Sequence, residues 1–171
     1  MIVGVPKEIK VHESRVAITP EGVSEFVHAG HTVIIEDNAG AASAITNEDF
    51  IAAGASIVAT ADDVWRTADL VLKVKEPIDV EYSKMRKGQT LFTYLHLAAS
   101  KICTDALVAS GTTAIAYETV EVNGTLPLLA PACSEALSQW TRALPSRCCT
   151  QTAFLNRNTF HFAKHTSMTL R

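Results

Sequence analysis

Short apolar runs rich in β-branched residues alternate with amphipathic segments along residues 1–120, and this alternation constrains the fold more than any other feature. The apolar runs lie at residues 1–6, 31–37, 56–59, 70–75, 89–96 and 112–118. Segments of helical type lie between them, at residues 19–30, 47–54, 62–68, 80–87 and 101–111. This pattern is typical of a parallel sheet with crossover helices. We therefore predict an α/β fold with an open, mainly parallel sheet and helices on both faces.

Two local signals support this division of the chain. Thr19 suits the N-cap of a helix, Pro20 its first turn and Gly30 the position just past its end. Asn123-Gly124 is typical of a two-residue hairpin turn, which predicts an antiparallel excursion after the last parallel strand. No G-x-G-x-x-G sequence is present, so the fold is expected to be Rossmann-like without the usual glycine turn, and no residue is assigned to a cofactor.

The charge of the chain excludes some classes of partner. The 171 residues carry a net charge of -3, which gives no electrostatic reason to expect nucleic acid or an anionic membrane. The apolar runs are too short to span a bilayer, and the first ten residues lack the order of a signal peptide. We expect a cytoplasmic protein with a small-molecule substrate.

The four cysteines form no disulfide framework. A zinc site at Cys148, Cys149, His161 and His165 has a His-x3-His half but lacks a spaced cysteine pair. The alternative, a basic segment with incidental thiols, is favoured, and no metal is expected.

Three polar residues are candidates for a site because ligands of open parallel sheets bind beyond the carboxyl ends of the strands. Lys75 ends the run at 70–75, His96 ends the run at 89–96, and Arg15 lies in the long loop after the first strand. An arginine can grip a carboxylate, a lysine can polarise an oxygen, and a histidine can move a proton near neutral pH. Each also has an ordinary structural explanation, such as a surface pair between Arg15 and Glu13. Lys73 is expected deeper in its strand, against a helix or with its amine reaching solvent.

Several long motifs carry a family resemblance. GVPKEIKVHESRVAITPEGVSEFVHAG at 4–30, LVLKVKEP at 70–77 and GQTLFTYLHLAAS at 88–100 resemble alanine dehydrogenases and the nucleotide-binding part of proton-translocating transhydrogenases. SGTTAIAYETV at 110–120 and LPLLAP at 126–131 resemble them too. One departure is His12, where the family usually has asparagine, so the loop that carries Arg15 is open to a different pose.

The resemblance implies a function and roles for the three candidates. Transhydrogenases lack the histidine at the end of this strand, so His96 favours alanine dehydrogenase. Arg15 then resembles the carboxylate-binding arginine, Lys75 the lysine that contacts the substrate, and His96 the catalytic acid and base. The implied reaction is reversible oxidative deamination of L-alanine to pyruvate and ammonia with NAD, in enzymes that form hexamers.

The charge and glycine content of the chain change near residue 132. Residues 1–131 hold 10 Lys and Arg against 17 Asp and Glu, whereas residues 132–171 hold 5 against 1 and no glycine. We predict a substrate domain at 1–131 and a divergent basic tail at 132–171, either partly helical or disordered. A shifted reading frame, an alternative end, an unrelated fusion and a divergent helix at 134–144 are the alternatives for the tail.

Three functions stay open at this point. The chain is the substrate domain of an alanine dehydrogenase, a transhydrogenase-like module, or a non-catalytic remnant that associates with other subunits. His96 and the missing glycine turn disfavour the second. The resemblance also implies a pocket methionine after residue 131 and a complete Rossmann domain, neither of which follows here. The isolated chain is therefore expected to be inactive.

Overall fold

The computed structural model describes residues 1–121, 123–126, 128, 155–156, 159–162 and 166–168. The α-helices are α1 (Pro20–His28), α2 (Asn47–Ala52), α3 (Ala61–Thr67), α4 (Asp79–Tyr82) and α5 (Lys101–Ser110). Short 3-10 turns are η1 (Ala41–Ser43), η2 (Leu97–Ala99) and η3 (Tyr117–Thr119). The strands of the main sheet are β1 (Ile2–Val5), β2 (Thr32–Glu36), β3 (Ser56–Val58), β4 (Leu70–Leu72), β5 (Thr90–Thr93) and β6 (Thr113–Ala116).

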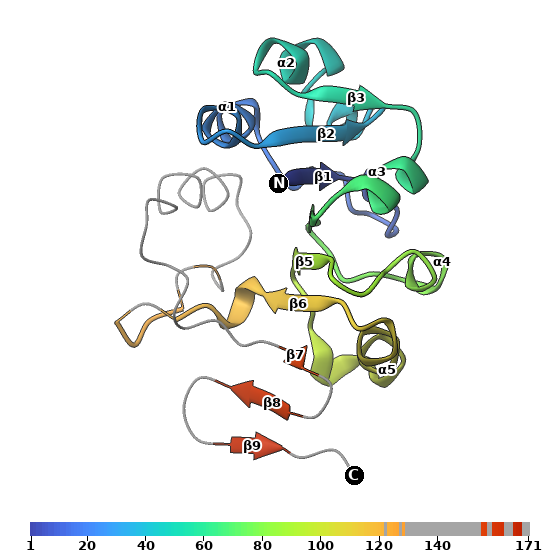
Figure 1. Cartoon of the computed structure of the whole chain (residues 1–171), viewed down its shortest axis with the longest axis vertical. Coiled ribbons are helices and arrows are strands. Elements are labelled where there is room, and N and C mark those ends of the chain that lie inside the picture. The colour runs from blue at the N-terminus through green and yellow to red at the C-terminus, as the bar shows by residue number, and fades with distance from the viewer. Residues whose placement is uncertain (122, 127, 129–154, 157–158, 163–165, 169–171) are drawn as a thin grey trace.

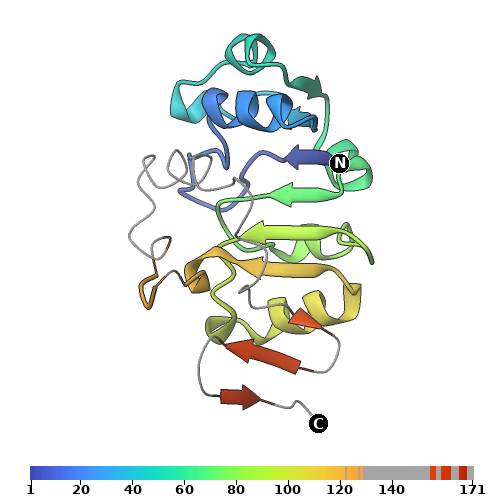
Figure 2. The ribbon, with the colours of Figure 1, turned by 60° about the vertical axis from the view of Figure 1, so that its left-hand side comes forward.

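The main sheet has six strands in the order β3-β2-β1-β4-β5-β6, and every neighbouring pair is parallel. Figures 1 and 2 show this order from one edge at β3 to the other at β6. The predicted open parallel sheet is therefore confirmed. The chain first builds outward from β1 to β3 and then returns to place β4 on the other side of β1. In folds of this type, that reversal opens a crevice beyond the carboxyl ends of the two central strands.

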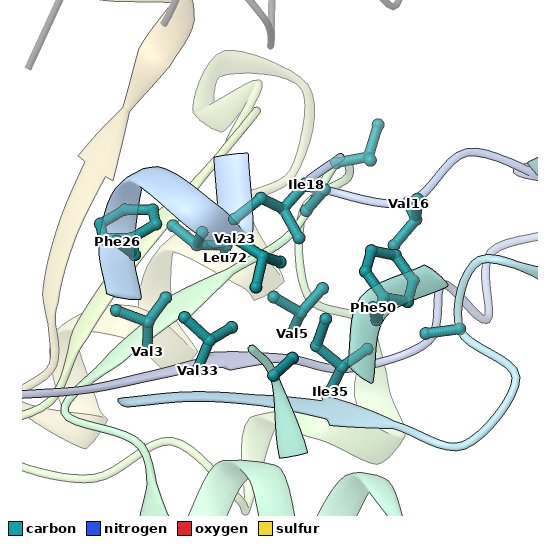
Figure 3. Packing of buried hydrophobic residues seen from close by; sticks show 14 of the residues in the cluster. Val3, Val5, Val16, Ile18, Val23, Phe26, Val33, Ile35, Phe50 and Leu72 are labelled. Carbon is teal, nitrogen blue, oxygen red and sulfur yellow. The ribbon is translucent and has the colours of Figure 1, made fainter. Parts of the chain in front are cut away.

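Helices cover both faces of the sheet, as predicted. Side chains alternate between the two faces along each strand, so each strand contributes to a buried cluster on either side. Leu72 and Phe92 belong to one buried cluster, whereas their neighbours Val71 and Leu91 belong to the other. Figure 3 shows the first cluster, in which Val23 and Phe26 of α1 pack over β1 and β2. The second cluster includes Trp65 of α3 and Leu107 of α5. Strands buried on both sides explain why the apolar runs are nearly continuous.

The predicted ends of the first helix are confirmed. The hydroxyl of Thr19 accepts a hydrogen bond from the backbone N–H of Gly22, Pro20 is the first helical residue, and Gly30 follows with a φ of 82°. The turn at Asn123-Gly124 also forms, and both residues have positive φ, 51° and 78°. Two consecutive positive φ values are what a type I′ turn requires.

Several predicted boundaries were wrong. β4 ends at Leu72 and not at Lys75, and β5 ends at Thr93 and not at His96. The helix expected at 80–87 is a single turn, α4. The helix expected at 134–144 lies outside the described residues. The described part of 155–168 forms a separate antiparallel sheet of β7 (Leu155–Asn156), β8 (Thr159–Phe162) and β9 (Thr166–Met168). Among the described residues, no helix has the length and apolar character needed to cross a membrane.

Candidate functional site

The loops that follow β1, β4, β5 and β6 meet at one end of the sheet, around the reversal of strand order between β1 and β4. Arg15 lies on the first of these loops, Lys75 follows β4 by three residues, and His96 follows β5 by three residues. All three predicted site residues therefore lie at the carboxyl end of the sheet, although the two strands end earlier than expected.

Lys75 lies on a stretch of backbone that is fixed from several sides. The hydroxyl of buried Thr93 donates to the carbonyl oxygen of Lys75 at 2.8 Å. The Lys75 ammonium lies 5.3 Å from the centre of the Tyr94 ring, close enough for a cation–π interaction. The Lys75 ammonium thus lies near the Tyr94 ring at the carboxyl end of the sheet, and Lys75 is only partly exposed to solvent.

Arg15 is paired with a carboxylate of its own loop. Its Nε and Nη2 atoms donate to the two oxygens of Glu13 at 2.7 and 2.5 Å, and its backbone N–H also donates to Glu13. Hydrogen bonding from Arg15 lowers the pKa of Glu13, and the nearby charge of Lys75 contributes in the same direction. The ion pair between Arg15 and Glu13 therefore forms, but the Glu13 side chain is only 7% exposed, so it is not a plain surface pair. It also lies within electrostatic reach of Lys75. His12, which precedes this pair, has a φ of 66°, a region that asparagine tolerates more readily than histidine.

His96 is exposed and has a left-handed backbone, with φ 48° and ψ 43°. The carboxylate of Glu118, just after β6, accepts the backbone N–H groups of Leu95 and His96 at 3.1 and 2.9 Å. The His96 ring lies edge-on to the Tyr94 ring, with 5.7 Å between centroids. Glu118 offsets the cost of the unusual conformation, which is about 1 kcal/mol for a residue with a side chain.

Tyr94 is the residue that brings two candidates together, because the Lys75 ammonium and the His96 ring both contact it. Arg15 is linked to this group more loosely, through Glu13. Tyr117 completes the cluster: its ring contacts Tyr94 at 5.6 Å, and its hydroxyl donates to the carbonyl oxygen of Val74 at 2.6 Å. Burial raises the pKa of Tyr117, so its hydroxyl stays protonated and donates.

The sequence reasoning missed Tyr94, Tyr117 and Glu118. Glu118 ends the predicted run at 112–118, so the criterion that selected Lys75 and His96 would have found it. Tyr94 and Tyr117 lie inside the predicted runs, and only the observed ends of β5 and β6 place them just past a strand. Lys73 lies just past the end of β4 and not within the strand, and of its two expected environments the helix is correct: its buried ammonium pairs with Glu81 of α4 and with Glu8 and does not reach solvent.

The loop between β1 and α1 has no G-x-G-x-x-G turn of the kind that binds the pyrophosphate of a dinucleotide in related folds. Within the residues that the structure describes, no three His, Cys, Asp or Glu side chains group as metal ligands. The residues proposed for zinc at 148, 149 and 165 lie outside the described part, as does the side chain of His161. What this site can do is bind a small anion and move a proton.

The family model described as "Alanine dehydrogenase/PNT, N-terminal domain" matches residues 4–136. The chain belongs to this family. An alanine dehydrogenase of Mycolicibacterium smegmatis is 70% identical over 132 residues, which are 77% of this chain and 36% of that protein. An alanine dehydrogenase of Mycobacterium tuberculosis is 64% identical over 132 residues, with the same shares.

Solved structures of the alanine dehydrogenase/PNT type agree with this. An L-alanine dehydrogenase superposes with a TM-score of 0.73 at 52% identity and covers 75% of this chain and 36% of its own. A transhydrogenase from Sinorhizobium meliloti superposes with a TM-score of 0.67 at 32% identity. The match covers 71% of this chain and 36% of the transhydrogenase chain. The chain thus spans about a third of the length of the relatives it matches, and the similarity ends near the predicted boundary at residue 131.

Proposed function

We propose that residues 1–131 form the substrate domain of an alanine dehydrogenase. In this proposal Arg15 and Lys75 bind the carboxylate of pyruvate or L-alanine, and His96 is the acid and base of the reversible deamination. The observation that carries the proposal is that the Lys75 ammonium and the His96 imidazole both contact the Tyr94 ring. The high identity to alanine dehydrogenases supports it.

The electrostatics suit weak binding of a small carboxylate. Lys75 supplies a positive charge beside an aromatic face, and Arg15 supplies further N–H donors. However, Glu13 already takes two N–H groups of Arg15, so an incoming carboxylate must share or displace it. The contacts are also partly exposed to water, which screens them. We expect a dissociation constant on the order of 1 mM or weaker.

His96 has a geometry suited to proton transfer. His96 is exposed, its backbone N–H is held by Glu118, and an imidazole is the commonest general acid and base in proteins. NAD would accept the hydride in the complete reaction, and we assign no residue of this chain to it. The roles assigned to this chain are therefore substrate binding and proton transfer, with assembly into a hexamer as a further expectation from the family.

The test is a titration of the 171-residue chain with pyruvate, followed by NMR. Wild type should show saturable shifts at Lys75 and Tyr94, and Arg15→Ala should lose them. Arg66→Ala is the matched control, because Arg66 is an exposed arginine on α3 that pairs only locally with Asp63. An assay with pyruvate, ammonium and NADH should give no turnover above background.

Other outcomes favour other functions. Binding of NADH without binding of pyruvate would favour the transhydrogenase-like alternative, for which the Sinorhizobium meliloti neighbour is the supporting observation. No binding of either ligand would favour the non-catalytic remnant. Turnover that His96→Ala abolishes would contradict the expectation of an inactive chain.

A further inference from the structure

Three buried charged side chains meet beside the backbone that leads to Lys75. The Lys73 ammonium lies 2.9 Å from a carboxylate oxygen of Glu81 and 3.3 Å from one of Glu8. The side chains of Lys73, Glu8 and Glu81 are 1%, 3% and 4% exposed. Buried charges are kept in proteins only where they are paired and hydrogen-bonded. This cluster, the Glu8–Lys73–Glu81 triad, joins the loop after β1 to the chain after β4 and to α4.

Glu8 does more than neutralise a charge. Its second oxygen accepts the backbone N–H of Val74 at 2.6 Å. The N–H of Lys73 donates to Phe92 of β5, so the next N–H, that of Val74, points to the opposite side, toward β1. β1 has already ended at Val5, and no strand carbonyl is available there. The Glu8 carboxylate takes the position of that missing carbonyl.

Val74, the residue before Lys75, is therefore held through both of its backbone polar groups, which belong to two successive peptide units. Glu8 accepts the N–H of Val74, and the Tyr117 hydroxyl donates to the carbonyl oxygen of the same residue at 2.6 Å. Thr93 then fixes the carbonyl oxygen of Lys75 itself. Of these three side chains, Glu8 is the one that contacts Val74 on the side of β1. The Glu8 carboxylate is in turn held by its ion pair with Lys73.

We propose that Glu8 is a positioning residue for Lys75: by replacing a strand carbonyl at Val74, its carboxylate aims the lysine over Tyr94 and into the anion site. The proposal rests on the proposed function of Lys75. The proposal gives the two carboxylates of the triad different roles. Glu81 also pairs with Lys73, but its other oxygen accepts the backbone N–H of Ile78 at the start of α4. Of the two carboxylates in the triad, Glu8 is the one that hydrogen-bonds to the backbone next to Lys75.

The test compares Glu8→Asp with Glu8→Gln. Aspartate keeps the negative charge but is one methylene shorter, so it loses the reach to Val74. Glutamine loses the charge but keeps an oxygen at the right distance, while Lys73 remains paired with Glu81. If Glu8 acts through the Val74 hydrogen bond, Glu8→Asp should raise the dissociation constant for pyruvate by about tenfold. Glu8→Gln should stay within about threefold of wild type. Glu81→Asp is the matched control, with the same shortening and no contact with Val74.

A second readout needs no ligand. Protons next to the Lys75 ammonium should show an upfield ring-current shift from Tyr94, and the Val74 amide should exchange slowly with solvent. Both should be lost in Glu8→Asp and kept in Glu81→Asp. The reverse order, in which Asp behaves as wild type and Gln does not, would show that Glu8 acts by its charge alone and would overturn the proposal. If wild type binds no pyruvate, the proposed function fails, while the ring shift and amide exchange still decide the role of Glu8.

Discussion

Replacing Lys73 by methionine should destabilise the fold strongly, because it removes the single positive charge from between two buried carboxylates. At 2.9 and 3.3 Å, with an effective dielectric constant of about 20, each attraction is about 5 to 6 kcal/mol. In wild type these attractions are largely offset by the cost of removing the charges from water. In the variant that cost remains without compensation, so the net loss at pH 7 should be about 3 to 5 kcal/mol.

The unfolding free energy lost in Lys73→Met should be greater at neutral pH than at acidic pH. Burial raises the pKa of Glu8 above 4.5, and Lys73 opposes that effect. A raised folded-state pKa means that the group favours the folded state below its unfolded pKa, and that this contribution is lost as pH rises through the folded pKa. Without Lys73 the pKa of Glu8 rises further. The difference between Lys73→Met and wild type should therefore be largest at pH 7 and shrink as pH falls toward 4.5.

The assay is urea unfolding at several pH values, followed by tryptophan fluorescence in a Trp140→Phe background, which leaves buried Trp65 as the reporter. Lys84→Met is the matched control, because Lys84 pairs with an exposed Asp62 and its replacement should cost less than about 1 kcal/mol. Adding Glu8→Gln to Lys73→Met should recover part of the stability. A Lys73→Met variant as stable as Lys84→Met, or a loss that is the same at pH 7 and pH 5, would refute the reasoning.

Two further predictions concern packing and reactivity. Gly4→Ala should cost about 1 to 3 kcal/mol of unfolding free energy, measured by the same urea assay, because a Cβ there would lie 2.6 Å from Ala68 Cβ and 2.8 Å from a Val64 methyl group of α3; unchanged stability would contradict the close approach of β1 and α3. Cys103 is 1% exposed and burial raises its pKa to about 11, so in a variant whose other three cysteines are serine it should react with thiol reagents at pH 8 only after unfolding in urea. Fast labelling of the folded protein would contradict its buried environment.

Much of the fold could be read from the sequence because it depends on neighbours in the chain. Apolar runs such as the one at 31–37 predict buried strands, and Thr19, Pro20 and Gly30 predict the ends of α1, since a helix cap involves residues only three or four positions apart. The missing glycine turn and the placement of the candidates at the carboxyl ends of strands also needed only local patterns. The motifs at 4–30 and 88–100 were enough to identify the family.

The tertiary structure decided what depends on residues far apart. β4 ends at Leu72, just past its last pair with β1 at Gly4 and Val71, and the N–H of Val74 beyond it is accepted by the carboxylate of Glu8, 66 residues away. Lys73 is buried only because Glu8 and Glu81 converge on it. His96 adopts a left-handed backbone that Glu118, 22 residues later, supports. Periodicity reports which side of an element is apolar, but it carries no information on which distant polar group will satisfy a buried N–H or charge, and those partners fix the site.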